Sequence, residues 1–511
     1  MTGTDEVYNV PRGTAYLTSQ QVVQYTGYLL FYILLARILT LTEVGEVTAL
    51  LLVQGVFTGI ISGSLPLAAT RFISRSVATR DLEGAAGVAR VTIRMSLAVA
   101  GPGLVIAIIL SPIISGFLGG IPNSNTLLLV TLFTGFCLDL MLLYTSFFLG
   151  IGKYAQTFYQ NALYVPLSRG LALALAYAGY RLYGIVIGWV IGAIAALLLS
   201  IYLWHGKLPK GRAYPVKPIL AFALPVFASA LITLGQQWGD VGIIYALLGP
   251  TTLAPYYYAV SSVTFLSILW MPVNQAIYPA LSADHVSGTH KEASERLATS
   301  FRLINLTVLP ISAALAAISS TALDVVYGPQ YMKEALTLSI LSLASIFVAE
   351  GVLLVTVLQA VGHTRKYLEI TLTSTLIFIG FVALLATPFQ TLAGALGRVL
   401  LSLLIVLMAR FSLRHVIDTH VFAAMRKALP LAAGVAIPLY LLDYFFGVSH
   451  IIRPLFQLIV LFGVFIILYG AISRQLKVFH QGDFAMLHDV LPADLRPLLK
   501  RVQRFIVSSD E

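Results

Sequence analysis

Charged residues interrupt several of the long apolar runs in this sequence. Two are arginines, Arg169 and Arg398, and three are carboxylates, Asp139, Asp240 and Glu350. A guanidinium presents a planar fork of donors that matches phosphate oxygens, so the arginines are candidates for binding an anionic headgroup. A carboxylate in apolar surroundings can be protonated or can hold Na⁺. The alternative for all five residues is structural pairing, in which an arginine and a carboxylate lock two helices together.

Three further arginines, Arg37, Arg71 and Arg75, stand at the ends of apolar runs. Arg71 and Arg75 follow the second run directly, where they are placed to meet a phosphate group as it enters. Basic residues at such places also anchor the loops of membrane proteins, and that alternative stays open. No phosphate loop, zinc motif or nucleophile elbow stands at a water-facing place, so no catalytic residue and no metal ligand is predicted.

The elements that must hold these charges are membrane-spanning helices. The chain is 58% hydrophobic and 11% charged, whereas a typical soluble domain is about a quarter charged. Fourteen apolar runs of helix-spanning length follow one another, and we therefore expect an all-α polytopic membrane protein. The runs begin near Thr14, Val44, Met95, Thr126, Gln156, Tyr183, Ile219, Tyr256, Leu303, Ala335, Leu368, Thr391, Ala428 and Arg453.

The basic residues predict an orientation. When the loops between the fourteen runs are assigned alternately to two sides, 26 of the 32 Lys and Arg residues fall on one side and four on the other. Cytoplasmic loops carry such an excess, so both termini are expected in the cytoplasm and the chain in the cell membrane. The net charge of +10 therefore does not indicate nucleic-acid binding, because no soluble basic module is present.

The chain also resembles itself at an offset of about 210 residues. Gly152 aligns with Gly362, and Gly184 aligns with Gly394; at an offset of 208, Arg94 aligns with Arg302. Because each repeat holds six spans, the two repeats are expected to be parallel and to enclose a central cavity. The predicted organisation is a six-helix lobe over 1–205, a second over 206–427, two additional helices over 428–473 and a cytoplasmic amphipathic tail over 474–511.

Several short segments resemble the polysaccharide and O-antigen flippases of the multidrug/oligosaccharidyl-lipid/polysaccharide exporter superfamily. The first span ends in FYILLAR at 31–37 and is followed by VGE at 44–46, and the second span ends in LPLAATRF at 65–72. Later segments that match are PALS at 279–282, YGPQY at 327–331 and LQAVG at 358–362. These segments cover about 12–414 of the chain.

The resemblance implies a transporter that flips a lipid-linked oligosaccharide or polysaccharide precursor by alternating access. Its substrate would be a glycan joined through phosphate or pyrophosphate to a polyprenyl-type lipid, with membrane lipids, a glycan polymerase or glycosyltransferases as partners. No cofactor is expected beyond coupling to Na⁺ or H⁺. A cation-coupled multidrug exporter on the same fold is the alternative function. An enzyme is not expected, because no loop between spans exceeds roughly 25 residues.

Overall fold

The computed structural model describes residues 10–118, 123–208, 213–275, 277–278, 281, 290–414, 421–449, 454–476 and 478. These residues divide into two compact units, 1–254 and 255–511. Nearly all of the predicted amphipathic tail, from residue 479 onward, lies outside the described residues. Each unit is built from helices, and among the described residues no strand occurs.

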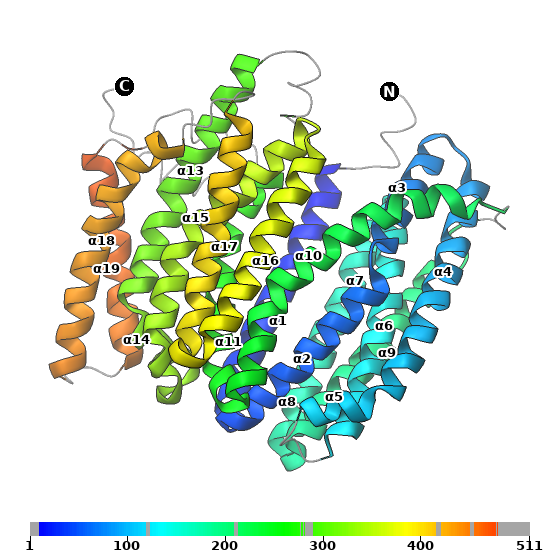
Figure 1. The fold of residues 1–511 in the computed structure, drawn as a ribbon, viewed down its shortest axis with the longest axis horizontal. Coiled ribbons are helices and arrows are strands. Elements are labelled where there is room, and N and C mark those ends of the chain that lie inside the picture. Colours follow the sequence, from blue (N-terminus) through cyan, green and yellow to red (C-terminus); the bar gives the residue numbers. More distant parts are fainter. Residues whose placement is uncertain are drawn as a thin grey trace. The chain divides into compact units, whose positions relative to one another are not determined.

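The first unit contains the helices of the first seven predicted spans (Figure 1). They are α1 (Val10–Ile38), α2 (Leu41–Ser62), α3 (Leu65–Ala78), α4 (Leu82–Ile109), α5 (Ser111–Phe117), α6 (Ser124–Gly150), α7 (Tyr154–Val165), α8 (Leu171–Leu175), α9 (Arg181–Trp204) and α10 (Val216–Leu248). Two π-helical turns, Pro166–Gly170 and Ala176–Tyr180, flank α8, so that α7 and α8 form one continuous span.

The second unit contains most of α11 (Pro250–Thr264) and all the helices that follow it. They are α13 (His290–Ala317), α14 (Ser319–Tyr327), α15 (Ala335–Ala360), α16 (Thr364–Phe389), α17 (Thr391–Leu413), α18 (Val421–Ser449) and α19 (Pro454–Gln475). The C-terminal pair α18 and α19 packs inside this unit, with α18 along α13 and α19 against α14.

The predicted spans are confirmed as helices. Eleven helical segments among the described residues are long and apolar enough to cross a membrane. One of them, Tyr154–Trp204, contains two expected spans joined at Gly179, whose φ of 99° breaks the helix. The remaining two expected spans coincide with α1 and α11. Large apolar side chains lie exposed on the outer faces, as for Leu384 at 80% and Ile467 at 69%, which suits a lipid environment.

The internal repeat is visible in the helix boundaries of the two units. Four pairs of helices, α4 and α13, α6 and α15, α7 and α16, and α9 and α17, each begin about 210 residues apart. A short helix also follows the first member of this series in both units, as α5 in one and α14 in the other. The same order of helices therefore recurs, as the sequence alignment predicted.

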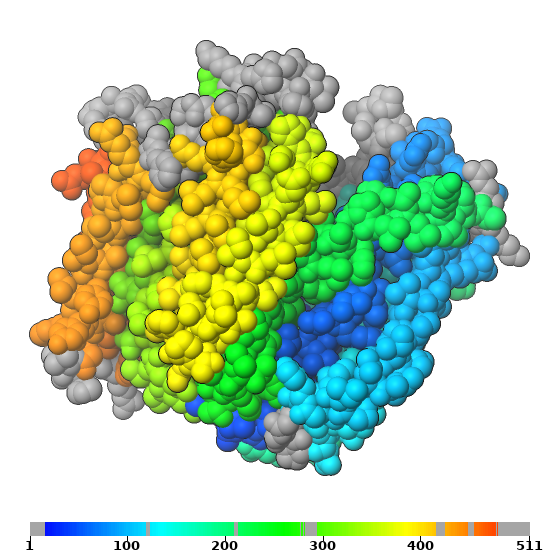
Figure 2. Space-filling model, viewed as in Figure 1, coloured from blue at the N-terminus to red at the C-terminus, as the bar shows by residue number. Residues whose placement is uncertain are grey.

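Helix α10 packs with the first unit. It runs along α2 and continues against α3, and the space-filling view shows its surface lying against that of α2 (Figure 2). The contact is close because Gly55 on α2 faces the ring of Trp238 on α10. The seventh span, which we expected to open the second lobe at residue 206, makes contacts with α2, α3 and α5 of the first unit.

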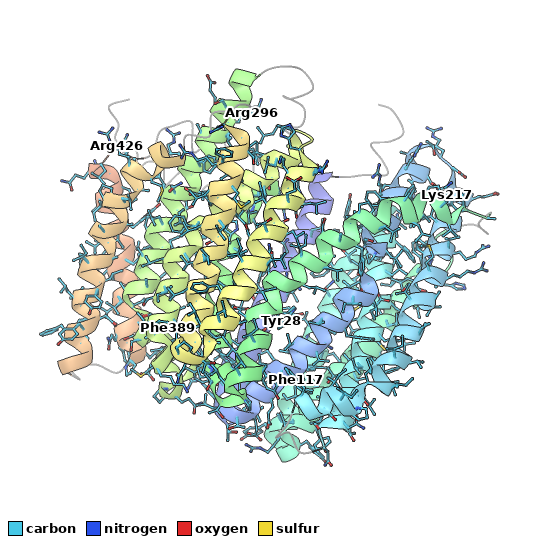
Figure 3. The ribbon with its side chains drawn as sticks, in the orientation of Figure 1. Tyr28, Phe117, Lys217, Arg296, Phe389 and Arg426 are labelled. Carbon is cyan, nitrogen blue, oxygen red and sulfur yellow. The ribbon has the colours of Figure 1, made fainter. Side chains whose placement is uncertain are left out.

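Each unit carries basic side chains at one end. In the second unit Arg296 and Arg426 lie at the same end, opposite Phe389 (Figure 3). In the first unit Lys217 lies at the end opposite Phe117. This agrees, within each unit, with the sorting of basic loops that the sequence predicts.

Glycines allow the fifth and sixth spans of the first unit to approach each other. Gly184, Gly188 and Gly192 recur every four residues on α9, and a Cβ on each would fall within 3 Å of backbone atoms between Ser168 and Ala176. The sequence-based interpretation of these glycines as a packing ridge is therefore confirmed.

We predict that Gly188→Ala lowers the stability of the first unit by about 1–3 kcal/mol, because the added methyl group meets the backbone of Ala172. The measurement is the midpoint of thermal unfolding in detergent. The matched control is Gly101→Ala on α4, whose Cβ would meet nothing within 4 Å. Equal midpoints for the two variants would contradict the packing ridge.

Candidate functional site

Arg169 lies in an aromatic box in the first unit. Its guanidinium carbon is 5.0 Å from the ring centre of Tyr28, 4.9 Å from Phe31 and 5.2 Å from Trp189. Tyr28, marked in Figure 3, and Phe31 come from α1, and Trp189 comes from α9. The residue is only 7% exposed. Three rings thus surround one cation, an arrangement in which ring faces partly replace water.

The aromatic box leaves hydrogen-bond donors unused. Nε and Nη1 of Arg169 and Nε1 of Trp189 are buried and have no hydrogen-bond partner among the described residues. No carboxylate of the described chain forms an ion pair with Arg169. Unmet buried donors are unfavourable, by about 1–3 kcal/mol each and more for a charged group. Such donors suit a ligand that brings oxygen acceptors and negative charge.

The local sequence explains where Arg169 points. Pro166 has no backbone N–H, so the helix ladder is interrupted, and the chain forms the π-helical turn Pro166–Gly170. π-helical turns inside α-helices occur frequently at functional sites. Arg169 is therefore placed by a local irregularity that is encoded at Pro166.

Asp139 on α6 is bound by two serines. Ser62 Oγ on α2 donates to its Oδ1 at 2.6 Å, and Ser96 Oγ on α4 donates to its Oδ2 at 2.8 Å. The carboxylate is 1% exposed. Asp139 forms no ion pair with Arg169. The structure therefore excludes a pair between these two residues, and ion coupling stays open for Asp139.

Glu350 on α15 occupies a comparable place in the second unit. Asn305 Nδ2 on α13 donates to Glu350 Oε1 at 2.8 Å, and the positive charge of Arg410 on α17 acts on the same carboxylate. Glu350 Oε2 and Asn305 Oδ1 are buried acceptors with no hydrogen-bond partner among the described residues. Among the described residues, the basic side chain that acts on Glu350 is thus Arg410, whereas the sequence offered Arg169 or Arg398 as partners for the buried carboxylates.

Arg398 and Asp240 belong to other helices than Asp139 and Glu350. Arg398 is half-buried on α17, and Asp240 is fully buried on α10. Asp240 accepts a hydrogen bond from the backbone N–H of Val241 at 2.9 Å. Their roles in headgroup binding and ion coupling stay predictions.

The three arginines at span ends are exposed. Arg71 and Arg75 lie on α3, and the guanidinium of Arg71 stacks on the ring of Phe222 at 4.4 Å. Arg37 lies at the end of α1 that precedes α2, so it stands at the opposite end of the unit from α3. Arg37 and the pair on α3 therefore do not contribute to one site.

A charged contact that the sequence analysis did not predict joins α2 and α9. Glu43 caps α2 together with Thr40, each side chain bonding the other's backbone N–H, and Glu43 also forms an ion pair with Arg181 at the start of α9. The Thr-x-x-Glu spacing of a capping box was the available signal for the first half of this contact. The ion pair depends on residues 138 positions apart.

The structure also contains a cavity of about 700 Å³ in the second unit, between α14, α15, α18 and α19. Asp443 accepts hydrogen bonds there from Thr321 at 2.6 Å and from Gln457 at 2.8 Å, and Asp324 also faces the cavity. Among the residues that the structure describes, no group of three metal-ligating side chains lies together.

Comparison with known proteins identifies the family of this chain. The model of a family described as "Polysaccharide biosynthesis protein" matches residues 10–285, more than half of the chain. The chain therefore belongs to the polysaccharide biosynthesis protein family. No curated protein is similar enough in sequence to match.

Solved structures share the fold. The lipid II flippase MurJ in an inward closed conformation has a TM-score of 0.70 at 14% identity, over 91% of this chain and 99% of that one. A multidrug resistance MATE family transporter of the MOP superfamily, inward-facing, has a TM-score of 0.64 at 17% identity, over 79% and 98%. A MOP superfamily transporter from Pyrococcus furiosus has a TM-score of 0.56 at 17% identity, over 79% and 95%. The chain is thus a helical, multi-pass membrane protein with the fold of these transporters.

We predict that Asn305→Leu lowers the stability of the second unit by about 1–3 kcal/mol, because Glu350 loses its hydrogen-bond donor. Thermal unfolding in detergent is the measurement. Asn161→Leu is the matched control, since both asparagines are buried and donate to the carbonyl four residues earlier, but only Asn305 also bonds a carboxylate. A loss no larger than that of the control would contradict the role assigned to Asn305.

Proposed function

We propose that this protein carries a lipid-linked oligosaccharide or polysaccharide precursor across the cytoplasmic membrane by alternating access, for surface glycan biosynthesis. The observation that carries the proposal is the guanidinium of Arg169, which is buried in an aromatic box and has no carboxylate partner in the described part of the chain. Membership of the polysaccharide biosynthesis family supports a glycan pathway. The fold shared with the lipid II flippase MurJ supports transport of a lipid-linked cargo.

In this mechanism the phosphate or pyrophosphate of the cargo binds at Arg169. Its oxygens accept hydrogen bonds from Arg169 Nε and Nη1 and from Trp189 Nε1, which have no acceptor among the described residues. The glycan crosses inside the protein. The polyprenyl-type tail stays in the bilayer, because moving an apolar chain from lipid into water is unfavourable. The cargo is moved unchanged, so the protein acts as a transporter and not as an enzyme.

The energetics of Arg169 favour a ligand over a structural role. A buried charge without a counter-charge destabilises a protein, and its replacement by an apolar residue of similar volume is often neutral or stabilising. A residue that breaks the rules of stable packing is expected where function requires it. The aromatic rings, whose centres lie 4.9–5.2 Å from the guanidinium carbon, offset only part of the free energy lost when the charge leaves water.

Access to Arg169 requires the protein to open. At 7% exposed the guanidinium is covered in this conformation, so the cargo reaches it only when the surrounding helices separate. Alternating access supplies such openings, first on one side of the membrane and then on the other. Arg398, half-buried in the second unit, is the corresponding candidate there.

Orientation follows from the basic ends of the two units. With those ends in the cytoplasm, Arg71 and Arg75 stand where a cytoplasmic cargo first meets the protein, and Arg37 stands near the opposite surface. A glycan polymerase or glycosyltransferases are the expected partners, because they make or consume the cargo. Coupling to Na⁺ or H⁺ would supply the driving force, with Asp139, Asp240 and Glu350 as candidate carriers.

A cation-coupled multidrug exporter is the second candidate function. The observation that favours it is the fold shared with a multidrug resistance MATE family transporter. Drug efflux from cells that express the protein, with no transfer of glycolipid in liposomes, would select this function over the first.

We predict that Arg169→Met lowers the rate of glycolipid flipping by about 10- to 100-fold, because a charge-assisted hydrogen bond to phosphate contributes about 1.5–3 kcal/mol. The same change keeps or raises the midpoint of thermal unfolding, because methionine fills the aromatic box without burying a charge. Flipping is measured with a fluorescent lipid-linked oligosaccharide in proteoliposomes, through its exposure to a membrane-impermeant quencher.

The control for this experiment is Arg90→Met, which removes an exposed arginine of α4 and should leave both flipping and stability unchanged. A folded Arg169→Met protein that flips at the wild-type rate would remove Arg169 from the mechanism. An Arg169→Met protein that loses stability and activity together would indicate a structural role instead.

A further inference from the structure

Asp139 joins three helices of the first unit at one point. Its two oxygens accept hydrogen bonds from Ser62 on α2 at 2.6 Å and from Ser96 on α4 at 2.8 Å, while the residue itself belongs to α6. The carboxyl group is 1% exposed and both serines are buried. Every hydrogen bond to this carboxyl group in the described structure therefore comes from a neutral hydroxyl.

Among the residues that the structure describes, no positive charge pairs with Asp139. Helices α2, α3, α4, α5, α7 and α9 pack against α6, and none of their titratable groups, nor those of α6 itself, forms an ion pair with Asp139 in the described residues. These groups are Glu43, Glu46, Arg71, Arg75, Glu83, Arg90, Arg94, Cys137, Tyr144, Tyr154, Tyr159, Tyr164, Arg181, Tyr183 and Tyr202. A carboxylate buried as an isolated anion is unfavourable, and one bound proton removes that penalty.

The second unit contains the repeat-related pair, but with a counter-charge. Glu350 on α15 corresponds to Asp139 on α6, and Asn305 on α13 corresponds to Ser96 on α4, each at the repeat offset of about 210 residues. A buried carboxylate and its donor thus recur at matching places. There, however, the positive charge of Arg410 acts on the carboxylate. Among the described residues, Asp139 is thus the member of this related pair on which no basic side chain acts.

Asp139 also holds a break in a membrane span. Ser62 is the last residue of α2, Gly63 follows with a φ of 48°, and α3 begins at Leu65. The next serine, Ser64, donates to the carbonyl of Ala223 on α10. The two serines on either side of Gly63 thus tie the break to α6 and to α10, so a change at Asp139 acts on the point where the span changes direction.

Protonation would change these bonds. A carboxylate accepts hydrogen bonds at both oxygens, whereas a carboxylic acid has one O–H that must itself donate. When Asp139 gains a proton, one of the two serine hydroxyls has to turn from donor to acceptor. Since Ser62 is next to the break, this exchange changes the hydrogen bond that holds the end of α2 to α6.

We propose that Asp139 is a proton-binding site whose occupancy is linked, through Ser62, to the break between α2 and α3. One proton is bound when the site opens to water and is released when it opens again. The use of this proton to drive transport rests on the proposed function, whereas the binding of the proton does not.

The test is infrared difference spectroscopy of the purified full-length protein in lipid, recorded as the pH is changed with no cargo present. A protonated carboxyl group has a C=O band that is separate from the bands of the carboxylate. We expect a band that appears as the pH falls, that is lost in Asp139→Asn and that persists in Glu350→Gln. Because no cargo is used, a negative result here is distinct from a failure of glycolipid flipping.

Three results would overturn the proposal. The first is a pH-dependent band that persists in Asp139→Asn, and the second is a band that disappears when Na⁺ is added at constant pH, which would make the site a sodium site. The third result comes from Ser62→Ala, a second variant for the case that Asp139→Asn fails to fold. This change removes one hydrogen bond to Asp139 and should shift the frequency of the band. An unshifted band in folded Ser62→Ala would show that Asp139 is not linked to the break between α2 and α3.

Discussion

The hydrocarbon core of a bilayer offers no hydrogen-bond partner, and every polar group placed there must be satisfied by the protein itself. Helices meet this requirement for the backbone, which is why the described chain is helical throughout its spans. The same requirement acts on each charged side chain, where a wrongly placed charge costs roughly 2.5 to 3.5 kcal/mol by insertion scales. The few charges that remain inside the spans are therefore the most informative residues of the molecule.

Three of these charges have three different kinds of surroundings. Arg169 is covered by aromatic rings, Asp139 is bound by serine hydroxyls, and Glu350 has both an amide donor and a basic neighbour in Arg410. Only the third arrangement brings opposite charges near each other. The first two leave an uncompensated charge, one positive and one negative, within the same unit. An uncompensated charge is where an external partner, an anionic headgroup or a proton, has the largest effect.

The internal repeat makes the difference between the units meaningful. Equivalent helices recur in the same order, and each unit places a carboxylate and its donor on equivalent helices. The surroundings of the two carboxylates differ, because serine hydroxyls bind Asp139, whereas an amide donor and the positive charge of Arg410 act on Glu350.

Much of this architecture follows from the order of residues along the chain. Apolar runs of helix length, basic residues concentrated in every second loop and a repeat of about 210 residues can all be read from the sequence, so the fourteen spans and their order were predictable from them. The intramembrane charges were also identifiable, because any charge in an apolar run stands out.

The partners of these charges could not be identified from the sequence. Ser62, Ser96, Asn305 and the rings around Arg169 are ordinary residues of their own helices, and only packing between helices that are distant in sequence brings them to the charges. Whether a buried charge pairs with an opposite charge, lies among aromatic rings or binds a proton depends on these neighbours in three dimensions. The hydropathy of the sequence does not reveal them.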